Sequence, residues 1–311
     1  MKHRFRHIRE PGKPALIDLP AAAEIGETIR VMESPLANRR ALLDAILKGD
    51  YRKPFIGENA EGRTLYLALH SIQSRMRLDD PWALDLLYTR KAMSFLLFRP
   101  DPRKILMLGL GGGSLAKYCY RHLPAARVEA VEIDADVIAL REYFCVPPPS
   151  HRFEVIQGDA AKYVESVRKT YDIVIADAFD HGGITPSIRI ATFYEQVRSR
   201  LREDGIMVSN FAGTRAERRD HLAMMARAFS DNVLLVPVEG EGNEIALAFN
   251  AGVAKPSWKA IHERARDLAQ SFQLDFPRFA SRIERSQKIG YLRRALSQPS
   301  TRKRHDPPSP A

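Results

Sequence analysis

The chain has 311 residues, enough for one large domain or two modest ones with a buried core. Hydrophobic residues make up 45% of it and charged residues 28%, the proportions of an ordinary soluble globular protein. No apolar run approaches the roughly 20 residues of a membrane-spanning helix, so we expect no membrane segment. The two cysteines have no metal-ligand spacing, so we expect no bound metal and a reducing, cytoplasmic compartment.

The formal net charge is +10, which by itself would be compatible with nucleic-acid binding. Much of this excess lies near the two ends of the chain, in Lys2, Arg4, Arg6 and Arg9 and in Arg293, Arg294, Arg302, Lys303 and Arg304. Aromatic residues do not alternate with these charges, as they would in a surface on which bases stack. We therefore expect solvated ends and no nucleic-acid partner.

Residues 1–100 are predicted to form an N-terminal region of strands, a hairpin and a helix. Short apolar stretches broken by proline and glycine fill the first 60 residues, and Ser34–Leu47 has the spacing of a helix. Thr64–Gln73 reads as a strand that can continue as a hairpin to Met76. Asp80, followed by Pro81, predicts the start of a helix of about 18 residues.

Residues 101–250 alternate strands with helices, which predicts an α/β fold with a doubly wound sheet. The predicted strands are Ile105–Leu110, Val128–Ile133, Phe153–Gln157, Ile173–Asp177, Ile206–Phe211, Val233–Val238 and Ile245–Phe249. The predicted helices are 115–122, 135–143, 160–169, 188–202 and 215–229. Seven strands, the last two close together, favour the Rossmann-like sheet of S-adenosylmethionine-dependent transferases over a dehydrogenase, which needs a second βαβ half.

The remainder of the chain is predicted to pack outside this sheet or to lack structure. Residues 251–296 contain two amphipathic helices that separate near Asp275–Pro277. Residues 297–311 are rich in serine, proline and basic residues, which predicts a disordered tail.

Glycines follow the first strand of the predicted sheet. Ile105–Leu108 is short and apolar, as in a buried parallel strand, and Gly109, Gly111 and Gly113 come directly after it. Glycines let the backbone approach a ligand, and a helix starting behind them presents unpaired N–H groups. The run is either a nucleotide cradle or only a turn. Glu132, about twenty residues downstream, favours the cradle, because nucleotide-binding folds place a ribose-binding carboxylate there.

Acidic residues follow the next two strands, at the edge where open α/β sheets bind ligands. Glu132 can accept hydrogen bonds from two ribose hydroxyls. Asp159 can accept one from an adenine amino group, with Ala160 beside the ring, or can cap the following helix. Asp134 has the same choice between a ligand and the cap of the helix from Ala135, and we favour the cap. Together these residues predict a nucleoside site.

Asp177 and Asp180 follow the fourth strand and are the candidates for reaction chemistry. Two carboxylates three residues apart at a strand end can orient an amine nucleophile and accept its proton. His181 is a further candidate base, but the sequence shows no partner for it.

These motifs resemble those of the polyamine aminopropyltransferases, the family of the spermidine and spermine synthases. The family's glycine loop, Gly-Gly-Gly-Asp-Gly-Gly after Pro-Arg-Lys and a short strand, resembles the run from Pro102 to Ser114. Its Val-Glu-Ile-Asp matches Val131–Asp134, its Gly-Asp matches 158–159, and its strand ending Asp-Ser-Ser-Asp matches Tyr171–Asp180. A Phe-Tyr pair matches residues 193–194. The similarity extends from about Thr64 to Asn250.

The resemblance implies decarboxylated S-adenosylmethionine as donor, a small-molecule amine as acceptor and methylthioadenosine as product. It implies that Asp177 is the general base and that Tyr88 assists the amine. It places Gln73 near the nucleoside. Family members usually form dimers or tetramers, so the resemblance also implies a homo-oligomer.

Two departures mark the chain as a divergent member. The loop aspartate that holds the donor's aminopropyl ammonium in the family falls on Gly112. The family's Tyr-His-Glu becomes Tyr88-Thr89-Arg90, which puts a cation where an acid would attract a polyamine. The acceptor is therefore left open.

Two other functions remain compatible with the motifs. One is methyl transfer from S-adenosylmethionine itself, although methyltransferases commonly have an acid where this chain has Met107. The other is a non-catalytic nucleoside-binding protein. Asp177 and Asp180 argue against it, because they indicate retained chemistry.

Overall fold

The computed structural model describes residues 15–21, 26–69, 71–180, 183–238, 242–253 and 256–297. The predicted disordered tail lies outside these residues, apart from Ser297. Over the described part of the chain, every helix is too short or too polar to cross a membrane.

The N-terminal region is an antiparallel five-stranded sheet in the order β1-β2-β3-β4-β5. Its strands are β1 (Ala15–Asp18), β2 (Thr28–Glu33), β3 (Phe55–Glu58), β4 (Gly62–Ala68) and β5 (Ser71–Arg77). The predicted hairpin is confirmed, since β4 pairs with β5. The helix predicted from Ser34 starts later, as α1 (Arg39–Lys48), because the side chain of Asn38 accepts the N–H groups of residues 40 and 41 and caps it there.

The helix predicted from Asp80 is wrong in its start and its length. Asp80 accepts the N–H of Trp82 and closes only a turn. The guanidinium of Arg90 donates to the carbonyl oxygens of Leu84 and Asp85, so those carbonyls are satisfied without a helix. The helix begins seven residues later, as α2 (Leu87–Ala92), and continues as the 3₁₀ helix η1 (Met93–Leu97).

The predicted seven-stranded sheet is confirmed, in the order β13-β14-β12-β9-β6-β7-β8. Its strands are β6 (Lys104–Leu108), β7 (Arg127–Glu132), β8 (Phe153–Gln157), β9 (Tyr171–Ala176), β12 (Leu201–Phe211), β13 (Val233–Pro237) and β14 (Glu244–Phe249). β14 runs antiparallel to β12 and to β13, and the other pairs are parallel. The chain leaves β6 toward β7 on one side and returns to β9 on the other, which is a topological switch point, where such sheets bind ligands.

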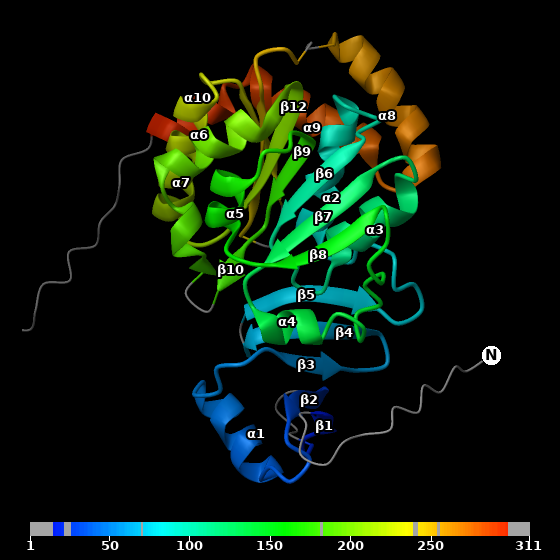
Figure 1. The fold of residues 1–311 in the computed structure, drawn as a ribbon. Coiled ribbons are helices and arrows are strands. Elements are labelled where there is room, and N and C mark those ends of the chain that lie inside the picture. The colour runs from blue at the N-terminus through cyan, green and yellow to red at the C-terminus, as the bar shows by residue number, and fades with distance from the viewer. Residues whose placement is uncertain are drawn as a thin grey trace, which may run out of the picture.

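Helices cover both faces of this sheet (Figure 1). They are α3 (Ser114–His122), α4 (Ala135–Ala139), α5 (Ala160–Ser166), η2 (Pro186–Ile188), α6 (Ala191–Arg200), α7 (Arg215–Ala228), α8 (Trp258–Phe272), α9 (Phe276–Lys288) and α10 (Tyr291–Ser297). The two predicted C-terminal helices are three, because Gly290, at φ 63°, turns the chain between α9 and α10. The helix predicted over 188–202 is η2 followed by the shorter α6.

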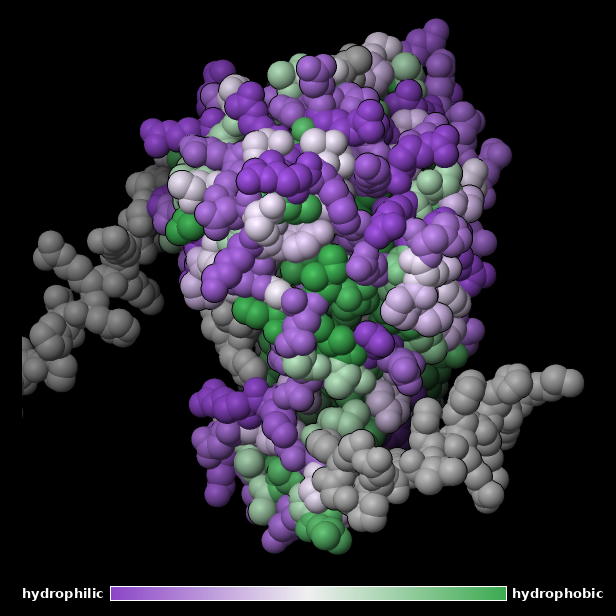
Figure 2. Space-filling view, in the orientation of Figure 1, coloured by the Kyte–Doolittle hydropathy of each residue, from purple (hydrophilic) through white to green (hydrophobic). Residues whose placement is uncertain are grey.

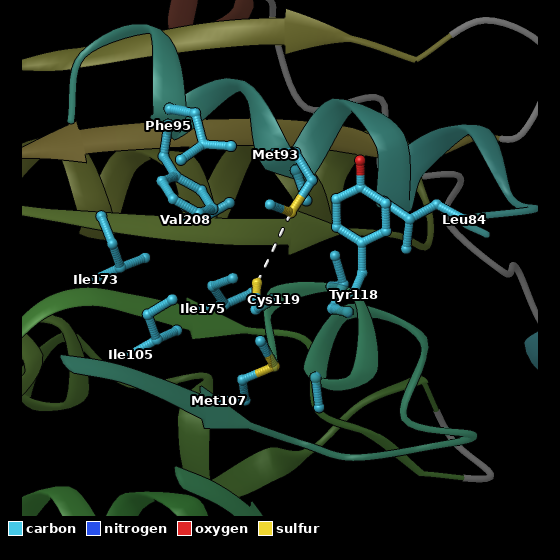
Figure 3. Packing of buried hydrophobic residues seen from close by; sticks show 14 of the residues in the cluster. Leu84, Met93, Phe95, Ile105, Met107, Tyr118, Cys119, Ile173, Ile175 and Val208 are labelled. Carbon is cyan, nitrogen blue, oxygen red and sulfur yellow. Dashed lines mark hydrogen bonds between the residues drawn. The ribbon is translucent and has the colours of Figure 1, made fainter. Parts of the chain in front are cut away.

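Successive side chains of a strand point to opposite faces of the sheet, so the hydrophobic core has one part on each face. Figure 3 shows Met93 and Phe95 of η1 facing Ile105, Ile173 and Val208 on three neighbouring strands. This face is also packed by α3, α8 and α9, and the opposite face by α5, α6, α7 and α10. Figure 2 shows hydrophobic residues gathered near the middle of one side of the molecule, close to where β8 and the β4–β5 hairpin lie in Figure 1.

Candidate active site

A cavity of about 110 Å³ lies at the carboxyl ends of β6 and β9. Six of the predicted site residues line it, namely Gln73, Tyr88, Gly109, Gly111, Glu132 and Asp177. Ser74, Thr89 and Phe179 line it too and were not predicted. Residues from β5, α2 and the large sheet therefore meet around one space.

Gly109 brings the glycine loop against the end of β9. Its φ of 102° is one that side-chain-bearing residues rarely adopt, and a Cβ there would lie 2.1 Å from the carbonyl oxygen of Asp177. On either side of this contact, the N–H of Gly109 donates to Val131 O at 2.8 Å and the N–H of Asp177 donates to Leu108 O at 2.9 Å. Only glycine lets residue 177 come this close to the loop.

Glu132 ends β7 and holds the glycine loop in place. Its Oε2 accepts the N–H of Leu110 at 2.9 Å and that of Gly111 at 3.4 Å, while its Oε1 accepts the N–H of Asp134 at 3.0 Å. The predicted cap is also confirmed: Asp134 Oδ1 accepts N–H groups in the first turn of α4. A carboxylate offers about four lone-pair directions, so Glu132 retains acceptor capacity toward the cavity.

A smaller adjoining cavity, of about 20 Å³, contains the remaining nucleoside candidates. Asp159 and Ala160 line it, and Glu132, Gly109 and Phe179 line both cavities. Asp159 Oδ1 accepts the N–H of residue 162 at 2.9 Å and so caps α5. Because Glu132 borders both cavities, Asp177, Glu132 and Asp159 form a row of acids along them.

Asp177 is held by two side-chain donors. The hydroxyl of Tyr88 donates to Asp177 Oδ2 at 3.3 Å, with the carbonyl oxygen of Gln73 at 3.5 Å, and Asn210 Nδ2 donates to Asp177 Oδ1 at 2.9 Å. Asn243 Nδ2 in turn donates to Asn210 Oδ1 at 2.9 Å, which fixes which end of the Asn210 amide faces the acid. Burial raises the pKa of Asp177 above its ordinary value, and the bonds from Asn210 and Tyr88 offset part of that rise.

The sequence prediction missed Asn210 and Asn243. Asn210 lies near the end of β12, which is parallel to β9, so extending the search for polar residues to the fifth strand would have found it. Asn243 precedes β14, whose antiparallel direction brings its start to the same edge. That direction was not part of the sequence prediction.

Asp180 and His181 follow Asp177 in the chain, beyond the end of β9. The backbone of Asp180 pairs with Gly183 in the short hairpin of β10 (Phe179–Asp180) and β11 (Gly183–Ile184). The side chain of Asp180 and the whole of His181 lie outside the described residues.

The two departures from the family pattern have different structural settings. A Cβ on Gly112 would lie 2.7 Å from Ser74 Oγ and 3.0 Å from Phe144 Cδ1, so these neighbours leave no room for a carboxylate there. Arg90 does not line this cavity but another one, beyond α2, and Thr89 faces the site. The cation at residue 90 therefore does not replace an acid inside the cavity.

Among the described residues, no cluster of His, Cys, Asp and Glu has the arrangement of a metal site.

A mixed seven-stranded sheet with polar side chains at its switch point defines the Rossmann-like fold of the methyltransferase type. A solved structure of a probable spermidine synthase from Corynebacterium glutamicum shares this fold, with a TM-score of 0.58 and 23% sequence identity, and the match covers 74% of this chain and 91% of that one. The structure of human methyltransferase-like protein 13 in complex with SAH shares it too, with a TM-score of 0.52 and 24% identity, and the match covers 60% of this chain and 90% of that one.

Sequence comparisons narrow the class to one family. The spermine/spermidine synthase domain model matches residues 88–233. The polyamine aminopropyltransferase of Chromobacterium violaceum is 34% identical over 240 residues, which cover 76% of this chain and 92% of that protein. That of Neisseria meningitidis serogroup A is 33% identical over 237 residues, or 75% and 90%. The chain belongs to the polyamine aminopropyltransferase family.

Proposed function

We propose that the protein transfers an aminopropyl group from decarboxylated S-adenosylmethionine to a small amine and releases methylthioadenosine. Asp177 is the general base of this proposal. The observation that carries it is the position of Asp177 between Tyr88 and Asn210, in a cavity that it shares with Glu132. Relatives named polyamine aminopropyltransferase, 33–34% identical over about three quarters of the chain, support the same reaction.

The donor's nucleoside is proposed to lie along the row from Glu132 to Asp159. The carboxylate of Glu132 accepts the ribose hydroxyls, Asp159 accepts the adenine amino group, and Ala160 lies beside the ring. Gly109 and Gly111 leave the floor of the cavity open for the sulfonium end. Gln73, on β5, borders the cavity from the N-terminal sheet.

The chemistry requires a base because a protonated amine has no lone pair. Asp177 accepts one proton from the ammonium, and the freed nitrogen attacks the donor's methylene carbon beside the sulfonium. The new N–C bond forms as the C–S bond breaks, and the electron pair of the C–S bond leaves with the sulfur of methylthioadenosine. A carboxylate whose pKa burial has raised is a better proton acceptor near neutral pH. Tyr88 and Asn210 keep both carboxylate oxygens oriented.

The acceptor is proposed to be an amine that enters beside Tyr88 and Thr89. We assign Asp180 as a second acid for that amine, as the family motif implies. The proposal includes a homo-oligomer of two or four chains and a cytoplasmic location, where such biosynthetic reactions take place.

The test is release of methylthioadenosine, followed by chromatography, with decarboxylated S-adenosylmethionine and a panel of diamines. We expect turnover by the native protein and a loss of about 10²-fold or more in Asp177→Asn, which keeps the shape but removes the base. Calorimetry with methylthioadenosine is the control, since Asp177→Asn should bind it as the native protein does. Methyl transfer from S-adenosylmethionine to the acceptor, with no turnover of the decarboxylated form, would refute aminopropyl transfer. Equal activity of the native protein and Asp177→Asn would refute the role of the base.

A further inference from the structure

Two buried serines meet where the glycine loop faces the N-terminal sheet. Ser74 lies on β5 and Ser114 is the first residue of α3, and both border the active-site cavity. The two residues are 4% and 8% exposed, and their Oγ atoms lie 2.9 Å apart. The proton transfer assigned to Asp177 makes no use of either hydroxyl.

Strand β5 is the wall of the cavity that faces the glycine loop. A Cβ on Gly111 would lie 3.8 Å from the carbonyl oxygen of Gln73 and 3.9 Å from Ser74 Cβ. A Cβ on Gly112 would lie 2.7 Å from Ser74 Oγ, so the serine hydroxyl occupies the space into which a side chain at residue 112 would project. The N-terminal sheet therefore supplies a polar group at a point of the loop where glycine has no side chain.

The proposed position of the donor directs its aminopropyl chain toward this wall. In that position the nucleoside lies along Glu132, the sulfonium lies above the glycines, and the carbon that is attacked lies within reach of the amine at Asp177. The rest of the chain continues past that carbon and ends in an ammonium group, which needs hydrogen-bond acceptors once it leaves water. Ser74 meets the loop at Gly112, one residue beyond the glycines below the sulfonium, and so lies where this chain ends.

The hydroxyl hydrogens of the two serines are already used inside the protein. Ser114 Oγ donates to the carbonyl oxygen of Arg75, at 3.5 Å, so the hydrogen between the two Oγ atoms is that of Ser74. A hydroxyl has one hydrogen and two lone pairs, so both oxygens retain lone pairs that accept hydrogen bonds. Such a pair binds a group that carries N–H donors and has no donor left for a carboxylate or a phosphate.

From this arrangement we infer that Ser74 and Ser114 bind the terminal ammonium of the donor's aminopropyl chain. The inference rests on the proposed aminopropyl transfer and makes β5 the element that recognises the group to be transferred. An ammonium binds a neutral hydroxyl less strongly than it binds a carboxylate, because only one partner is charged. The two serines therefore set a preference for a tail with an amino group and leave most of the affinity to the nucleoside.

The experiment is calorimetric titration of the full-length protein, without an acceptor, with two adenosyl sulfonium ligands. One is decarboxylated S-adenosylmethionine, and the other is methylthioadenosine methylated on its sulfur, which keeps the nucleoside and the sulfonium but lacks the aminopropyl chain. We expect Ser74→Ala/Ser114→Ala to bind the first ligand at least about tenfold more weakly and the second as the native protein does. The matched control is Ser94→Ala, which removes the hydroxyl of a buried serine on η1, outside the cavity, and should change neither affinity.

The comparison of the two ligands separates a role in binding from a role in folding. Equal weakening of both ligands would overturn the inference, because the serines would then only support the glycine loop. An unchanged affinity for the decarboxylated donor would overturn it as well. If thermal unfolding shows that the double variant does not fold, Ser74→Ala alone provides the same comparison. A native protein that binds the decarboxylated donor but releases no methylthioadenosine with any amine would refute the proposed transfer instead, so the two failures are distinguishable.

Discussion

Replacement of Asn210 by leucine tests whether the hydrogen bond to Asp177 tunes the base. Asn210 is a positioning residue in the proposal, because it touches the acid and not the reacting atoms. Leucine is similar in size and cannot donate a hydrogen bond. The change removes the 2.9 Å bond to Asp177 Oδ1 and leaves the bond from Tyr88 in place.

The expected effect is a shift of the pH profile toward higher pH. The bond from Asn210 stabilises the ionised form of Asp177 and lowers its pKa, so its loss raises that pKa further. A hydrogen bond to a charged group contributes about 1.5–3 kcal/mol, and about 1.4 kcal/mol corresponds to one pH unit. The acid limb of kcat/KM should therefore move up by about one to two units. Activity near pH 6 falls much more than activity near pH 9.

The assay is kcat/KM for methylthioadenosine release, measured from about pH 5 to 10. Ionisation of the amine substrate also shapes this profile, but it is the same for every variant, so the difference between profiles reports the enzyme. The matched control is Asn243→Ala, which removes only the outer bond to Asn210 Oδ1. It should shift the limb by less than about half a unit. A loss of activity that is equal at every pH, with methylthioadenosine still bound, would refute the reasoning and indicate a purely structural role for Asn210.

Two further predictions concern the glycine loop and its support. Glu132→Gln should weaken methylthioadenosine binding at least about tenfold, because an amide replaces the carboxylate that accepts loop N–H groups and the proposed ribose hydroxyls. Calorimetry measures this, Glu154→Gln on β8 is the control, and an unchanged affinity would contradict the nucleoside assignment. Gly112→Ala should lower the free energy of unfolding by about 1–3 kcal/mol, because its Cβ would lie 2.7 Å from Ser74 Oγ, and Gly112→Ala/Ser74→Gly should recover most of the loss. Urea unfolding measures it against Gly158→Ala, where a Cβ meets nothing within 4 Å, and equal effects of the two alanines would contradict the steric explanation.

The seven-stranded sheet was predictable because its strands are short apolar runs between strong turn residues. The glycines after Leu108 and the acids after Val131 and Ile156 mark strand ends in the sequence itself.

The helix predicted from Asp80 was wrong for a physical reason that the sequence does not contain. Its cap and proline are good local signals, but the side chain of Arg90 binds the carbonyls that the helix would have used.

The acids of the candidate site were predictable from the sequence, and the asparagines that complete it were not predicted. Carboxyl ends of parallel strands meet at one edge, so Glu132, Asp159 and Asp177 could be grouped from the strand pattern alone. Asn210 lies near the end of β12, a parallel strand that the search did not include, and Asn243 precedes β14, whose antiparallel direction only the assembled sheet shows.

The sequence by itself determined the fold class and the row of acids, because both follow from local periodicity and spacing, and it indicated the family through the resemblance of its motifs. Tertiary structure decided which partners hold Asp177, and that Gly112 faces Ser74 while Arg90 faces a second cavity. The reason is distance along the chain. Tyr88 and Asn210 lie 89 and 33 residues from Asp177, and only packing of β5, α2 and β12 around the switch point brings them together.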